Sequence, residues 1–251
     1  MQRIRSLGTS AFLFAFLALL LAPFALSQTP GTTSMPGMEM SSPQPSVNAI
    51  STATLLADKR ESEFNHRLAG FFVICAGLLV LAESRFARRW SWLRYAWPMC
   101  FLAAGLFILV YSDTEIWPFG PQTPWFAVTH NLEDLQHKLF ALILLGLGYV
   151  ELQRARQRLT AAWSRWFFPL AAMGGAVLLI FHVHSGNMHA PHAMQTMEHI
   201  QEQHRWFAAT GFAVGVSSLA ARMPHKWQRF FNAAWPTLLI VLGVLLTLYT
   251  E

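Results

Sequence analysis

The sequence predicts an all-α membrane protein: a signal segment, a flexible linker, and a bundle of six transmembrane helices arranged as three hairpins. Its 251 residues are 54% hydrophobic and only 12% charged, whereas an average soluble domain has about 25% charged residues. The apolar residues form six long runs without alternation, which is typical of membrane helices rather than strands. Basic residues are confined to short connections between the runs, which indicates membrane topology and excludes nucleic acid as a partner.

The first 27 residues have the pattern of a signal peptide. Arg3 and Arg5 precede an apolar run at 11–26, and the residues at 25–27 form a fair cleavage site. The run is short for a spanning helix, so cleavage is favoured, although an uncleaved anchor would give the same downstream orientation. Residues 28–56 are rich in Ser, Thr, Pro and Met, and this composition predicts a flexible exported linker.

The remaining residues, 57–251, form the predicted membrane domain. Each of its apolar runs has the length of a membrane helix, and the expected helices span about 66–84, 95–112, 135–152, 166–184, 203–221 and 233–249. Cys75 and Cys100 both fall inside these runs, so we expect no structural disulfide.

Charge in the connections predicts the orientation of the bundle. Three short loops, at about 85–94, 153–165 and 222–229, carry most of the arginine and lysine, so we expect them on the cytoplasmic side. The other connections carry most of the acidic residues. Both ends of the mature chain then face outward, which agrees with the signal segment. The expected location is the bacterial inner membrane, with the mature N- and C-termini periplasmic.

The three hairpins have the features of an internal repeat. His66 lies 71 residues before His137, and His137 lies 67 residues before His204. The same two steps separate two other sets of residues: Gly77, Gly148 and Gly215, and Pro98, Pro169 and Pro236. Hairpins of similar length can bring residues into register by chance, but agreement among three residue types favours duplication.

The repeat also aligns the outer ends of the second helix of each hairpin. Tyr111, His182 and Tyr249 occupy one position, and Asp113, His184 and Glu251 occupy another. Imidazole is the commonest metal ligand, so histidines gathered at one end of a bundle indicate a metal or haem site. The alternative is interfacial histidines that bind water, headgroups or helix ends. The first candidate ligands are His66, His137, His182, His184 and His204.

Two acidic residues precede these histidines by about one helical turn. Glu63 and Asp134 stand three residues before His66 and His137, where they can orient the imidazoles as hydrogen-bond acceptors. They can equally serve as favourable acids in the first turn of a helix, and for Asp134, which follows Asn131, we favour that role.

A second concentration of soft ligands lies in the connection at 185–203. Thioether together with imidazole points to copper before other metals; the candidates are Met188, His189, His192, Met194, Met197 and His199. The linker adds Met35, Met38 and Met40, for which transient Cu(I) capture and low-complexity drift are equally good explanations. Zinc remains an alternative, because His with Asp or Glu also suits that ion.

The middle of each apolar run lacks ionisable residues. Proton relays and pumps need such groups near mid-membrane, so the pattern argues against ion movement. Cys75, Met99, Cys100 and Met173 are soft ligands at depth, but they are also ordinary core residues, and core packing is favoured. No hydrolytic or phosphate-binding signature occurs, which predicts a non-enzymatic protein.

In layout, residues from about 60 to 251 resemble the bacterial copper resistance D group (CopD-like) of inner-membrane proteins. The resemblance rests on the signal segment, the Met-rich linker, and the outer-face His and Met on a multi-helix bundle. It implies periplasmic copper handling and resistance, with movement of copper toward the cytoplasm. On this chain, copper binding would fall to His66, His137, His182, His184 and His204.

The sequence leaves two alternatives to copper handling. One is an electron-transfer protein that binds haem b, resembling cytochrome b561, with His66 and His137 or His182 and His204 as axial ligands. Transfer of electrons across the membrane needs a second, inner site, and His225 is the sole inner histidine. The other is an assembly protein that loads metal into a respiratory enzyme. The expected partners are a metal ion, the lipid bilayer, and a periplasmic copper carrier or a respiratory enzyme.

Overall fold

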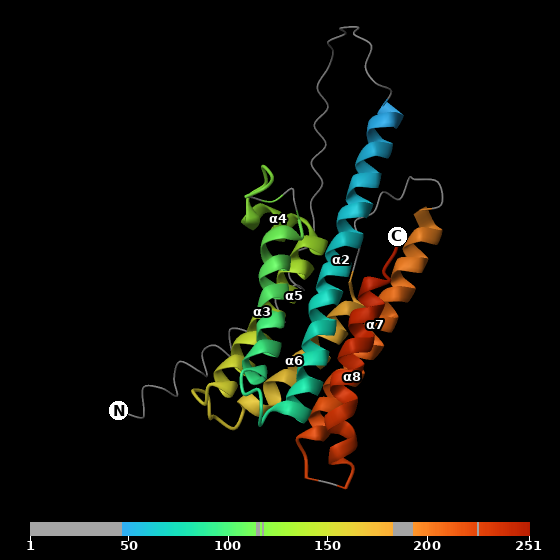
Figure 1. Ribbon diagram of the computed structural model, residues 1–251. Helices are drawn as coiled ribbons and strands as arrows, with labels where there is room; N and C mark the ends of the chain where they lie inside the picture. The colour runs from blue at the N-terminus through green and yellow to red at the C-terminus, as the bar shows by residue number, and fades with distance from the viewer. Residues whose placement is uncertain (1–46, 114–115, 117, 183–192, 225) are drawn as a thin grey trace. The chain divides into compact units, whose positions relative to one another are not determined.

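The computed structural model describes residues 47–113, 116, 118–182, 193–224 and 226–251, and for 47–55, 193 and 194 it describes the backbone alone. The predicted signal peptide (1–27) and most of the predicted linker (28–56) lie outside the described residues. The helices described are α2 (Val47–Phe86), α3 (Leu93–Tyr111), α4 (Pro124–His130), α5 (Leu132–Ala155), α6 (Ser164–Ile180), α7 (Ala193–Ala221) and α8 (Gln228–Thr247) (Figure 1).

The all-helical class predicted from the sequence is confirmed over the described residues, which contain no strand beyond one isolated bridge between Ile116 and Gln122. Four segments are long and apolar enough to cross a membrane: Leu56–Phe86, α3, α5 and α8. α6 is a shorter apolar helix. Large apolar side chains such as Leu78, Leu106 and Leu170 are exposed on the outer faces. Exposed apolar surface on long apolar helices is the pattern of a protein that sits in a bilayer.

α2 begins well before the apolar run that predicts it. The expected start was residue 66 and the helix begins at Val47, so ten residues assigned to the linker are helical. The extension is rich in Ala, Leu, Glu, Lys and Arg, which are strong helix formers. Glu63 adds ion pairs one turn away on either side, with Lys59 at 3.8 Å and Arg67 at 2.8 Å. In Figure 1, α2 extends past the upper ends of the other helices.

Six of the helices form a closed ring. The order of neighbours around it is α2, α3, α5, α6, α7 and α8, with α8 packed against α2. α5 and α6 pack least closely of these neighbours. Helices on opposite sides of the ring do not contact one another directly, so the centre is available for side chains and for a cavity.

Three tight helix crossings follow the predicted repeat. A Cβ atom placed on Gly77 would lie 2.7 Å from the carbonyl oxygen of Pro236. At Gly148 the same distance to the Pro98 oxygen is 2.7 Å, and at Gly215 it is 2.8 Å to the Pro169 oxygen. Each glycine thus removes the side chain that would block the approach of the neighbouring helix backbone. The repeated spacing of Gly and Pro in the sequence therefore corresponds to three equivalent helix contacts. One of them, between Gly77 on α2 and Pro236 on α8, closes the ring.

The end of the ring opposite the histidines is filled by aromatic side chains. The ring centroid of Phe168 lies 5.9 Å from that of Phe101, 6.2 Å from Trp97 and 5.2 Å from Trp235. Beyond them, the buried Glu151 pairs with Arg154 at 2.6 Å and with Arg222 at 3.6 Å. This aromatic floor closes the interior of the bundle at that end.

Candidate metal centre

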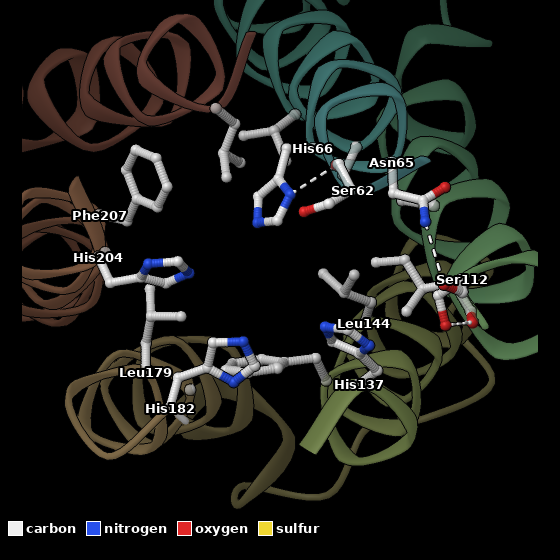
Figure 2. Close-up of a pocket in the computed structure, with 18 of the residues that line it drawn as sticks. Ser62, Asn65, His66, Ser112, His137, Leu144, Leu179, His182, His204 and Phe207 are labelled. Atoms are coloured by element: carbon white, nitrogen blue, oxygen red, sulfur yellow. Dashed lines mark hydrogen bonds between the residues drawn. The ribbon is translucent and has the colours of Figure 1, made fainter. Parts of the chain in front are cut away.

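Four imidazoles from four segments of the ring gather around one cavity of about 900 Å³. His66 comes from α2, His137 from α5 and His204 from α7, and His182 follows the end of α6. Figure 2 shows all four rings pointing toward the same space between the helices. The histidines that the repeat predicts at the starts of three helices are thus brought to one rim, together with one histidine from the end of a fourth.

The hydrogen bonds of two of these histidines fix which ring nitrogen faces the cavity. His66 Nδ1 lies 2.8 Å from the backbone oxygen of Ser62, and His204 Nδ1 lies 2.8 Å from that of Ile200. A carbonyl oxygen only accepts, so each imidazole donates from Nδ1. Nε2 then carries the lone pair and is the nitrogen that can serve as a metal ligand.

The other two histidines are oriented in the same way by side chains. His137 donates from Nδ1 to the Asp113 carboxylate at 2.8 Å, and His182 donates from Nδ1 to the amide oxygen of Gln136 at 2.8 Å. The amide nitrogen of Gln136 donates to the Phe181 backbone oxygen at 2.8 Å, which fixes the amide orientation. An acceptor behind Nδ1 is the usual support for a histidine that binds a metal through Nε2.

Three of the six pairs that the four rings form have spacings close to what a shared ion requires. Their ring centroids are 5.0 Å apart for His182 and His204, 5.4 Å for His137 and His182, and 5.9 Å for His66 and His204. With a metal–nitrogen bond of about 2.0 Å, two imidazoles on one tetrahedral ion have ring centres about 5 Å apart. Two of these three neighbouring pairs therefore already have this spacing, and the His66–His204 pair needs a shift of less than about 1 Å.

Asp113 is the anchor of the His137 side of the site. Its second carboxylate oxygen accepts from Lys138 at 2.5 Å and from the Ser112 hydroxyl at 2.6 Å. Burial alone would raise the pKa of Asp113, but the hydrogen bonds from His137, Lys138 and Ser112 hold that pKa below its ordinary value. The carboxylate is therefore ionised at neutral pH and remains an acceptor for His137.

Glu133 is a ligand candidate that the sequence analysis did not single out. Its carboxylate, His137 and His182 each offer a ligand atom within 4.8 Å of the others. The signal was present in the sequence, because Glu133 stands four residues before His137 and so lies on the same face of α5.

Glu63, which was expected to accept a hydrogen bond from His66, has other partners. Glu63 pairs with Lys59 and Arg67 and accepts from the backbone nitrogen of Glu251, while the Nδ1 of His66 uses the Ser62 backbone. The acid expected behind His137 is also different, since Asp113 takes that place. Asp134 is buried in the first turn of α5, after the Asn131 cap, which is the helix-start position favoured for it.

Tyr249 was a candidate ligand position in the repeat, but its side chain stacks on a histidine instead. It occupies the repeat position of His182, but its ring stacks on His66 with 3.9 Å between centroids. Burial raises the pKa of Tyr249, so the phenol stays protonated and donates to Glu251 at 2.8 Å. The side chain therefore holds the His66 ring in place and is not a phenolate ligand.

The loop candidates are only partly described. Met197 lines the cavity. His199 does not: it is exposed on α7, and its Nε2 lies 3.5 Å from the Thr250 hydroxyl. Two residues beyond Met197 on a helix is a turn of about 200°, so His199 faces away. Four predicted ligands lie outside the described residues, namely His184, Met188, His189 and His192. The side chain of Met194 also lies outside them.

The mouth of the cavity is acidic. Apart from the histidines, the one basic residue in the described lining of the cavity is Lys59. Six carboxyl residues also line it: Asp58, Glu61, Asp113, Glu133, Asp134 and Glu251. This excess of carboxylates attracts cations and disfavours anionic groups at the rim.

Comparisons with protein-family models, with curated proteins and with solved structures each return no match for this chain.

Proposed function

We propose that this chain is a copper-binding integral membrane protein that handles copper on the outer face of the bacterial inner membrane. The observation that carries the proposal is the orientation of the four imidazoles. Each of His66, His137, His182 and His204 donates from Nδ1 to a fixed acceptor, which leaves Nε2 as the ligand atom of each ring. His137 and His182, with Glu133, already have ligand atoms within 4.8 Å of one another, and we expect His66 and His204 to move inward to join the ion. The sequence resemblance to the copper resistance D group agrees with this function.

The topology of the proposal is six membrane crossings arranged as three hairpins. α6 and α7 would cross with the four longer apolar helices, since both belong to the same closed ring. The basic loops at the opposite end from the histidines would face the cytoplasm, and the His rim with both mature termini would face the periplasm. A periplasmic copper carrier, or a respiratory enzyme that receives copper, are the partners that fit this orientation.

Copper is favoured over zinc by the ligands near the rim. Met197 places a thioether on the cavity wall, and thioether with imidazole is a set that copper accepts better than zinc does. For the same N and O ligands, Cu²⁺ also binds more tightly than Zn²⁺. Glu133 near His137 and His182 is the feature that would suit zinc.

Haem b is the second candidate, and the observation in its favour is the size of the cavity, about 900 Å³. Two imidazoles on opposite sides of a haem iron have ring centres about 6 Å apart. The His182–His204 and His137–His182 pairs are closer, at 5.0 and 5.4 Å, whereas the His66–His204 pair, at 5.9 Å, has that separation. The haem propionates would meet the carboxylates of the mouth, and this repulsion favours an ion over haem.

The test is metal content together with an absorption spectrum of the purified full chain from cells supplied with copper and iron. We expect about one copper per chain after chelator-free desalting and no Soret band. Copper at the level of an unrelated membrane protein purified in parallel would contradict the proposal. A strong Soret band would assign the site to haem instead.

A further inference from the structure

The cavity is much larger than a metal ion needs. An ion bound at the rim takes a volume comparable with one water molecule, about 30 Å³, whereas the cavity measures about 900 Å³. Below the imidazoles it continues to Phe101, Phe168 and Leu239 on the aromatic floor. A volume of this size is in the range of pockets for organic ligands.

The wall of α6 keeps this space open. Its cavity side carries small residues, Ala171, Ala172, Gly175 and Ala176, where a membrane helix commonly carries leucine. A Cβ atom on Gly175 would meet only Ile143, at 4.0 Å. The other walls are apolar, so the lower cavity excludes water and suits an apolar molecule.

The floor and the seams of the ring restrict how a ligand enters. The aromatic floor and the ion pairs of Glu151 close the cavity at the far end. α5 and α6 pack least closely of the neighbouring helices, so we expect a ligand that is dissolved in the membrane to enter between them.

The rim selects the head group of the ligand. Six carboxyl residues against one lysine disfavour phospholipids, fatty acids and other anionic heads. Carboxylate oxygens are acceptors, so those beside the imidazoles suit a neutral head that donates hydrogen bonds. A lipid-soluble quinol has such a head, with two hydroxyls on a flat ring, and an apolar tail.

We propose that the cavity binds a lipid-soluble quinol whose ring lies next to the His rim and which reduces copper there. The inference rests on the proposed copper function and adds an activity to it. One quinol loses two O–H protons and two electrons and becomes the quinone. Two Cu²⁺ ions, arriving one after the other, become two Cu⁺ ions. The protons pass to the carboxylates of the rim and then to the outer water.

The test uses the purified full chain in lipid nanodiscs, a short-chain ubiquinol, Cu²⁺ and a Cu⁺-specific chelator. We expect quinol oxidation faster than with Cu²⁺ alone and two trapped Cu⁺ per quinol. Gly175→Leu narrows the cavity below the rim and should slow the reaction at least about tenfold, because it displaces the ring from the rim. Gly174→Leu is the matched control, since a Cβ atom there meets nothing within 4 Å and Gly174 is not part of the cavity lining; it should behave as the wild type.

Metal analysis of the same samples separates the two proposals. Copper retained by the wild type with no quinol-dependent Cu⁺ overturns the quinol inference and leaves the copper site standing. No copper retained overturns the proposed function. Equal rates for Gly175→Leu and the wild type also overturn the inference. If Gly175→Leu does not fold, Ala172→Leu on the same wall replaces it. Quenching of tryptophan fluorescence by the quinone, which needs no copper, gives a second measure of binding.

Discussion

Replacing His137 and His182 together with alanine is expected to abolish copper retention. These two rings form one side of the site, 5.4 Å apart, and their loss leaves only His66 and His204 of the four imidazoles. An ion held by two imidazoles instead of four exchanges readily. We expect the affinity for Cu⁺ to fall at least about 100-fold. Copper per chain and competition with a Cu⁺ chelator measure the change.

Two single variants bracket this result. His130→Ala removes an exposed histidine that stacks on Phe126 at 4.1 Å and does not line the cavity, so its copper content should match the wild type. Asp113→Asn keeps all four imidazoles and removes the charged acceptor of His137, so the affinity should fall by an intermediate 10–100-fold, roughly. If the double variant still holds one copper per chain, His137 and His182 are not copper ligands, and the prediction is wrong.

Replacing Gly148 with leucine is expected to destabilise the whole bundle. A Cβ atom there would lie 2.7 Å from the Pro98 carbonyl oxygen, and a backbone atom in a packed helix has no room to yield. α3 and α5 must therefore separate, which costs about 3 kcal/mol. For a chain of this size the midpoint of thermal unfolding should fall by roughly 5–10 °C.

Circular dichroism during heating checks this prediction, with Gly174→Leu as the control of equal side-chain size on the neighbouring helix α6. The equivalent changes at Gly77 and Gly215 should behave like Gly148→Leu, because a Cβ atom at each position would lie 2.7–2.8 Å from a proline carbonyl oxygen. An unchanged midpoint for Gly148→Leu would show that these crossings do not hold the ring together.

The repeat explains why so much of the arrangement was predictable. His66, His137 and His204 recur at two steps, and Gly and Pro recur at the same steps. Since the contacts of Gly77, Gly148 and Gly215 with prolines are equivalent, a residue pattern in the sequence maps directly onto a helix crossing. One relation between neighbouring helices, applied three times, places three histidines at one rim.

The parts that escaped prediction depend on side chains that break the repeat. Asp113 and Tyr249 were aligned as ligand positions, yet one receives the Nδ1–H of His137 and the other stacks on His66. Which part a side chain takes depends on a neighbouring helix, and no local pattern specifies that. The cavity is equally hidden, because a void reflects the summed volumes of side chains from six helices.

Two local features could have been found in the sequence. The short helix α4 begins with Pro124 after Thr123, whose hydroxyl accepts from the backbone nitrogen of Phe126, and this is a standard start signal. The early start of α2 is hard to find because its first residues mix apolar with polar side chains and do not form a continuous apolar run. Hydrophobicity locates the part of a helix that crosses a membrane, whereas propensity and ion pairs decide how far the helix continues beyond it.

The most direct test of the central claim is X-ray absorption spectroscopy at the copper edge of the loaded full chain. If four fixed imidazoles share one ion, the spectrum should show nitrogen at about 2.0 Å, the outer-shell scattering of three or four imidazoles, and at most one sulfur. A shell dominated by sulfur, or one of oxygen without imidazole scattering, would contradict the account.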